Sequence, residues 1–106
     1  MSRARLPNCR PQVSFVLQRG EGKHGRFTVS AGGDGISHRI REVFVSGPPS
    51  DVMDVVRDGA ILVSLALQHG CPLETISKAL TRDDADLPAT VIGAVVEQLI
   101  VLEGPA

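Results

Sequence analysis

His69 and Cys71 are the pair of residues whose types and spacing could do chemistry, a nitrogen and a sulfur ligand two positions apart. They could contribute to a zinc site, but a structural zinc takes four ligands. Cys9 and either His24 or His38 would then have to converge on them, and no CxxC or HxxxH spacing favours this. We therefore expect no metal and no cofactor, with His69 capping helix carbonyls and Cys71 half-buried.

The same pair could also form a thiolate and its base. Nucleophilic catalysis needs a further group that stabilises the oxyanion, and no motif in the sequence supplies it. We therefore name no catalytic residue. Whether the chain takes part in an enzyme stays open, and we expect no catalysis from it alone.

Two other clusters have the composition of ligand sites without the spacing. The GGDG run at 32–35 lacks the Lys-Ser/Thr that completes a phosphate-binding loop, and it precedes a strand instead of a helix. Asp83, Asp84 and Asp86 lack the EF-hand spacing and its closing glutamate. We interpret the first cluster as a hairpin turn and the second as a solvated linker.

The elements that must position these residues begin with three strands. Residues 12–18, 26–31 and 40–45 show the alternation of apolar residues and the β-branched or aromatic content of strands. Glycine-rich turns separate them. Short connections between consecutive strands predict an antiparallel meander, whose apolar face needs a cover.

A long helix is expected to provide that cover. Ser50 follows a Gly-Pro-Pro break and is a good N-cap, and apolar residues then recur at helical spacing until Gly70. The second half of this helix is apolar almost all round, which predicts burial on more than one side. Gly59 and Ala60 are expected to allow close approach to the sheet.

Two shorter helices should follow. Pro72 suits the first position of a helix over 72–80, and Pro88 is expected to open a third helix that runs to about Leu102. The wide apolar stripe of the third helix must pack on the domain or on a second copy, and from it we predict a homodimer through residues 88–102. The fold class is α+β, a three-stranded antiparallel β-meander covered by a long buried α-helix and followed by two shorter helices.

The 106 residues predict one domain, which we divide into an extended basic arm (1–11), a single α+β domain (12–102) and a tail (103–106). The apolar and charged fractions of 42% and 22% are typical of a globular protein. No apolar run is long enough for a membrane span, and the first residues lack the apolar core of a secretory signal. With two cysteines that we expect to be reduced, these features predict a cytoplasmic protein.

Charge is unevenly distributed along the chain. Residues 1–49 hold eight basic and three acidic side chains, whereas residues 50–106 hold three basic and nine acidic ones. Either the two halves neutralise each other in the fold, or the basic half forms a face for an acidic partner or nucleic acid.

Residues 65–80 also have the order of a helix-turn-helix. Its second helix carries only Lys78, offset by Glu74, although non-specific affinity for DNA is mainly electrostatic. A small nucleic-acid-binding protein, using the basic half or residues 65–80, is therefore the alternative function and not the first one.

Several short segments, in this order, resemble a known family. They are Arg5-Leu6-Pro7 with Arg10-Pro11, Phe15, Phe27-Thr28-Val29, Asp34-Gly35, Glu42-Val43-Phe44-Val45, and the stretch from Ala60-Ile61 through Ser64-Leu65-Ala66-Leu67-Gln68-His69-Gly70 to Pro72-Leu73. Over roughly residues 5–80 the chain is similar to the small C-terminal TSCPD-type domain of adenosylcobalamin (vitamin B12)-dependent ribonucleotide reductases. It looks like a stand-alone small relative of that domain.

The resemblance implies a non-catalytic accessory or regulatory module in deoxyribonucleotide synthesis, acting through protein–protein contact. The partner that it implies is a ribonucleotide reductase large subunit. In that family the radical chemistry belongs to a large α/β barrel that this sequence does not contain, and neither cysteine matches a catalytic position. The cysteine-rich tail of family members is replaced here by an apolar helix.

The residues shared with the family divide into two groups. Ile61, Leu65, Ala66 and Leu67 are expected in the helix core. The polar residues form the set of candidate partner-facing side chains: Arg5, Arg10, Gln68 and His69. The alternative is that the arginines pin the arm to its own domain through carboxylates.

Overall fold

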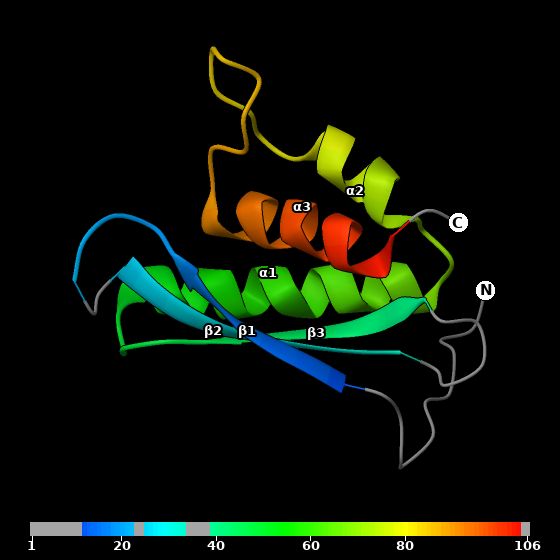
Figure 1. Ribbon diagram of the computed structural model, residues 1–106, viewed down its shortest axis with the longest axis horizontal. Helices are drawn as coiled ribbons and strands as arrows, with labels where there is room; N and C mark the ends of the chain where they lie inside the picture. Colours follow the sequence, from blue (N-terminus) through cyan, green and yellow to red (C-terminus); the bar gives the residue numbers. More distant parts are fainter. Residues whose placement is uncertain (1–11, 23–24, 34–38, 105–106) are drawn as a thin grey trace.

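A three-stranded antiparallel sheet is the base of the fold in the computed structural model, which describes residues 12–22, 25–33 and 39–104. The strands are β1 (Gln12–Gln18), β2 (Arg26–Gly33) and β3 (Ile40–Ser46), in the spatial order β1-β2-β3. The helices α1 (Asp51–Gln68), α2 (Leu73–Ala79) and α3 (Val91–Glu103) follow (Figure 1). The predicted α+β class and the meander are confirmed.

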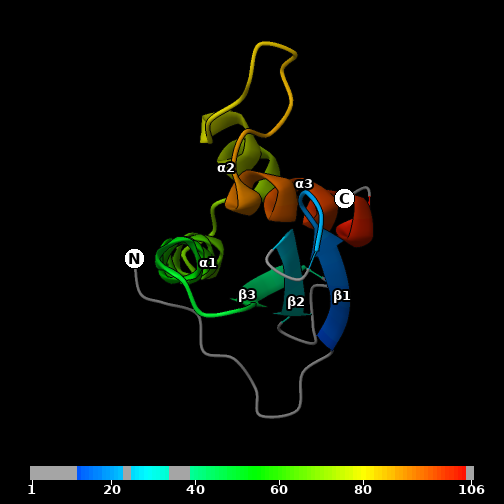
Figure 2. The ribbon, with the colours of Figure 1, turned by 90° about the vertical axis from the view of Figure 1, so that its left-hand side faces the viewer.

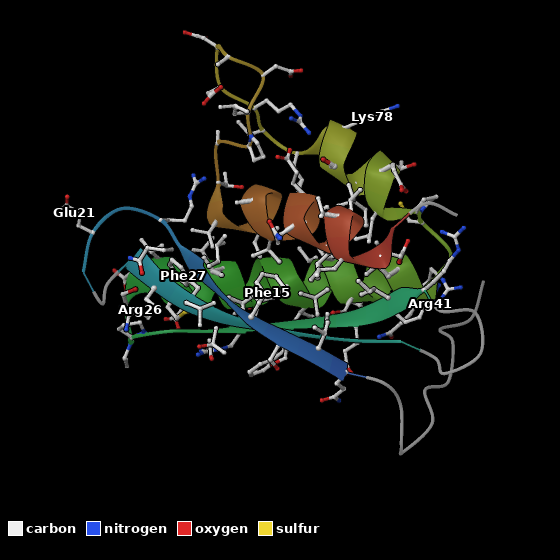
Figure 3. The ribbon with its side chains drawn as sticks, in the orientation of Figure 1. Phe15, Glu21, Arg26, Phe27, Arg41 and Lys78 are labelled. Carbon is white, nitrogen blue, oxygen red and sulfur yellow. The ribbon has the colours of Figure 1, made fainter. Side chains whose placement is uncertain are left out.

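One face of the sheet carries the apolar core. Val29 of β2 and Val45 of β3 are fully buried and lie opposite each other. Phe15 of β1 faces Val29 in the register and points toward the helices (Figure 3). The turn predicted at 32–35 is wrong for its first two residues, because Gly32 and Gly33 belong to β2. The register between β2 and β3 shifts at these two glycines. A glycine pair tolerates such an irregularity within a strand.

Helix α1 begins as its cap residue predicts. The Ser50 hydroxyl accepts a hydrogen bond from the Met53 amide at 3.0 Å, and Asp51 and Asp54 occupy the first turn, where the helix dipole favours acids. One side of the helix is buried in the core: Met53, Val56, Ala60, Val63 and Leu67. Figure 2 shows α1 beside β3, at the end of the sheet opposite β1.

The sequence predicted burial of the second half of α1 on more than one side, but some of its apolar side chains are exposed. Ile61 is 52% exposed and Leu62 66% exposed. The prediction that Gly59 allows close approach to the sheet is also wrong. Gly59 faces α3 instead, where an added methyl group would lie 2.6 Å from Cγ1 of Ile92. The helix therefore contacts the sheet on one side and α3 on another, and the rest of its surface has no neighbour within the described ranges.

Helix α3 is covered by the domain itself. It begins three residues later than expected, because the Thr90 hydroxyl caps it by accepting from the Gly93 amide at 3.0 Å, while Pro88 bridges to Arg82. Val95, Val96 and Leu99 of its apolar stripe are at most 1% exposed. The helix lies over the sheet next to α1, with α2 packed above it (Figure 2). The stripe that motivated a dimer through residues 88–102 is therefore used inside the domain.

Candidate interaction surface

The junction between α1 and α2 holds two of the candidate residues. Gln68, expected to face a partner, is 4% exposed and donates from Nε2 to the carbonyl of Arg41 at 3.0 Å. In return, the Arg41 guanidinium donates to the carbonyl of Leu67 at 2.9 Å, where a helix C-terminus favours a cation. Gln68 thus links α1 to β3 from inside the fold.

His69 and Cys71 complete the junction. The His69 amide caps α1 by donating to the carbonyls of Leu65 and Ala66 at 3.1 and 3.2 Å. Its side chain is half-buried, as is Cys71, whose thiol lies 3.8 Å from the Pro72 carbonyl. These positions agree with the structural roles expected for the pair.

No cluster of three or more His, Cys, Asp or Glu side chains suited to a metal ion occurs among the residues that the structure describes. Cys9, His24 and His38, which a zinc site at the junction would need, lie outside these residues, as do Arg5 and Arg10. Asp83 accepts instead from the amides of Ala85 and Leu87 at 2.9 and 3.0 Å. This geometry makes the expected linker an ordered turn.

Glu103, which the sequence analysis had placed in a tail, is the last residue of α3. It lies near the junction between α1 and α2 and lines the same cleft as Arg41 and Cys71. Its carboxylate accepts from the Ile40 amide at 2.8 Å and lies 3.5 Å from the Arg39 guanidinium. The side chain is 10% exposed, so a charge at this depth depends on these partners. The signal in the sequence was an acid that directly follows the apolar residues 99–102.

Beside Glu103 and the junction lies a cleft of about 380 Å³, whose lining includes Arg39, Arg41, Cys71 and Glu74. A second cleft, of about 500 Å³, lies at the other end between Arg19, Leu17 and α3. Both are open and mix charges of both signs. Neither therefore selects one class of small ligand.

The exposed side of α1 carries two parallel rows of side chains. Val52, Val55 and Leu62 follow an i, i+3, i+10 spacing and share one side of the helix, while Gly59 between them lies against Ile92 of α3. The neighbouring row, shifted by one residue, is acidic except for its last member: Asp51, Asp54, Asp58 and Ile61. We call these two rows the α1 outer face.

The apolar members of the α1 outer face are open to solvent. Val55 is 71% exposed and Val52 60% exposed, and Leu62 and Ile61 are also exposed. Arg57 lies 3.5 Å from Asp54 and leaves the acids in excess. A contiguous apolar tract of this kind on a protein surface marks an interaction site more often than an isolated exposed leucine does. Of these residues, the sequence analysis had assigned Ile61 to the helix core, where its 52% exposure shows that it does not lie.

The helix-turn-helix segment presents a different surface. In α2 the side chains of Leu73, Ile76 and Ser77 are buried, and Lys78 points outward from the helix (Figure 3). Glu74 is the other exposed charge of α2, so its open side is electrically balanced. Within the described ranges, none of the helices has the length and apolar character that crossing a membrane requires.

A model of the TSCPD domain matches residues 3–99 of the chain. This match confirms the resemblance predicted from the sequence, and it includes α1, α2 and most of α3. The TSCPD domain is found in adenosylcobalamin-dependent ribonucleotide reductases. No curated protein and no solved structure matches the chain.

Proposed function

We propose that this chain, which belongs to the TSCPD domain family, is a non-catalytic accessory or regulatory module of a ribonucleotide reductase. It acts through protein–protein contact, and its partner is the reductase large subunit. The family links the chain to ribonucleotide reductase-related proteins. The accessory role and the contact are our inference from the surface of the domain.

The observation that carries the proposal is the α1 outer face. Val52, Val55 and Leu62 are more than half exposed, although the same helix buries its opposite side in the core. Covering such side chains removes apolar surface from water, at about 25 cal/mol per Å². A partner that covers this face gains that free energy, and the row of acids beside it selects partners with basic side chains around an apolar centre.

The test is binding of the purified full chain to the purified reductase large subunit of the same organism, measured by isothermal titration calorimetry. We expect Leu62→Gln to weaken binding at least tenfold. Leu87→Gln is the matched control, because Leu87 is also exposed but lies in the loop before α3, and it should leave binding unchanged. Reductase turnover with and without the chain then reports whether the contact is regulatory.

The salt dependence of the binding affinity distinguishes this proposal from nucleic-acid binding. An interface centred on apolar side chains should keep most of its affinity between low and high salt, whereas affinity for DNA falls steeply with salt concentration. No binding to the large subunit at either salt concentration, or binding that Leu62→Gln leaves intact, would contradict the proposal. Salt-sensitive binding to duplex DNA in its place would favour the alternative function.

A further inference from the structure

The two edge strands of the sheet differ in how far the rest of the domain covers their backbone groups. At the β3 edge, the Ser64 hydroxyl accepts from the Val43 amide at 2.9 Å and lies 3.0 Å from the Val43 carbonyl. At Arg41, two residues before Val43 in β3, the backbone carbonyl accepts a hydrogen bond from the Gln68 side chain. Side chains of α1 therefore satisfy backbone groups that an edge strand would otherwise offer to another strand.

The β1 edge has no such cover among the residues that the structure describes. Strand β1 pairs with β2 on one side, and no other described strand pairs with it. Figure 2 shows β1 at the far side of the sheet from α1. A free strand edge is a template for pairing with a further strand.

The sequence of β1 lacks the usual protection of a free edge. Natural edge strands carry lysine, proline or inward-pointing charges that discourage pairing. From Gln12 to Gln18 the strand reads QVSFVLQ and contains none of these. The side chains on its core-facing side are also incompletely covered, since Val13 is 39% exposed and Phe15 and Leu17 are only half-buried.

The same seven residues are complementary to themselves. When two copies pair antiparallel about Phe15, Gln12 lies opposite Gln18, Val13 opposite Leu17, and Ser14 opposite Val16 of the other copy. Apolar residues thus meet apolar residues on the core side, and no charges of like sign are opposed. Val101, 68% exposed on α3 and in the same cleft as Leu17, adds apolar surface next to this edge.

We propose that two copies of this chain associate through the β1 edge, in antiparallel register about Phe15, to form a continuous six-stranded sheet. The α1 outer face lies at the opposite end of the sheet and stays free in this dimer. The proposal is thus independent of the reductase contact. A second copy fits the edge better than a charged partner strand, because β1 offers no charge to pair with.

The first experiment is the mass of the full chain in solution, by sedimentation equilibrium from 1 to 100 µM. We expect a dimer whose dissociation constant rises at least tenfold in Val16→Lys, because each lysine then lies opposite Ser14 of the other copy and diagonally across the two-fold axis from the second lysine. Phe44→Lys is the matched control: Phe44 is 57% exposed and Val16 59% exposed, and both are on the outer side of the sheet. The control should dimerise as the parent chain does.

The second experiment tests the register by disulfide formation, in a chain with Cys9→Ser and Cys71→Ser. Ser14→Cys and Val16→Cys chains, mixed and oxidised, should cross-link to each other faster than either cross-links to itself, because positions 14 and 16 are directly opposite. A full chain that is monomeric at 100 µM overturns the proposal. Dimerisation that appears only after deletion of residues 1–11 also overturns it, since the arm then competes for the edge.

Equal cross-linking of all pairs, or a dimer weakened equally by Phe44→Lys, would show that the interface lies elsewhere. These outcomes are separate from those of the reductase titration. Leu62→Gln should leave the dimer intact, and Val16→Lys should leave the reductase contact intact. Either proposal can therefore fail while the other stands.

Discussion

The hydroxyl of Ser64 bridges α1 to the backbone of Val43 in β3, accepting from the amide at 2.9 Å and lying 3.0 Å from the carbonyl. The same oxygen is 2.9 Å from the carbonyl of Ala60 one turn earlier in the helix. Ser64 is 7% exposed, so water does not replace these bonds. The hydroxyl of one helix residue thus satisfies the backbone amide and carbonyl of Val43 at the edge of the sheet.

Ser64→Ala should destabilise the protein by about 1 to 3 kcal/mol, because buried backbone groups of Val43 lose their partner. Urea denaturation followed by circular dichroism measures the change. Ser14→Ala is the control, since Ser14 is exposed and its hydroxyl lies 3.1 Å from the hydroxyl of Ser30; it should change stability by less than about 0.5 kcal/mol. Equal effects of the two substitutions would show that the bridge to Val43 adds nothing.

Gln68→Met should also reduce stability, by about 1 to 2 kcal/mol, because it removes the amide that donates to Arg41 while keeping a similar volume. Since Gln68 is buried, binding of the folded variant to the reductase should not change. Gln98→Met, at an exposed position of α3, is the control and should be neutral. A Gln68→Met chain of normal stability that no longer binds the reductase would restore the partner-facing role predicted from the sequence.

Gly59 marks the contact between α1 and α3. Gly59→Ala gains about 1 kcal/mol of helix propensity but forces a methyl group against Ile92, and overpacking of this kind costs about 1 to 3 kcal/mol. We expect a net loss of about 1 kcal/mol. The same change in an Ile92→Ala background should be stabilising, because the opposing side chain is gone.

A double-mutant cycle with thermal or urea unfolding measures this coupling between Gly59 and Ile92. A coupling energy of at least about 1 kcal/mol is expected for residues in direct contact. Strict additivity of the two substitutions would contradict the close packing of α1 on α3.

Glu103→Ala should lower the free energy of unfolding by about 1 to 3 kcal/mol, since the Ile40 amide loses a charged acceptor. Glu103→Gln keeps one acceptor oxygen and should cost less. The control is Glu74→Ala on the exposed side of α2, for which we expect no more than about 0.5 kcal/mol. If Glu103→Ala proved neutral, the end of α3 would behave as the tail that the sequence predicted.

The strands and the starts of α1 and α3 illustrate how far local patterns reach. Alternation in β1 and β3 identified both strands, and Ser50 marked the first residue of α1, because strand alternation and N-capping depend on neighbours in sequence. At α3 the sequence predicted a start at Pro88, but the helix begins at Val91 after the Thr90 cap, and Pro88 instead forms a bridge to Arg82. That contact depends on a loop whose closure the sequence does not specify.

The candidate surface was harder to predict than the fold. Leu62 and Val95 are both apolar residues at helical spacing, yet one is 66% exposed and the other 1% exposed. Gln68 and Glu103 are polar, and both are mostly buried. Residue type sets the free energy of burial, but which side of a helix meets another element depends on where the chain returns.

By itself, the sequence determined the elements, their order, the antiparallel meander and the family resemblance, since these follow from periodicity, turn residues and short motifs along the chain. Only the tertiary structure decided that α3 is buried in its own domain, that the outer side of α1 is free, and that Ser64 and Gln68 close one edge of the sheet. The physical reason is that burial and edge pairing arise between segments distant in sequence. Their positions depend on packing of the whole chain and not on any one segment of it.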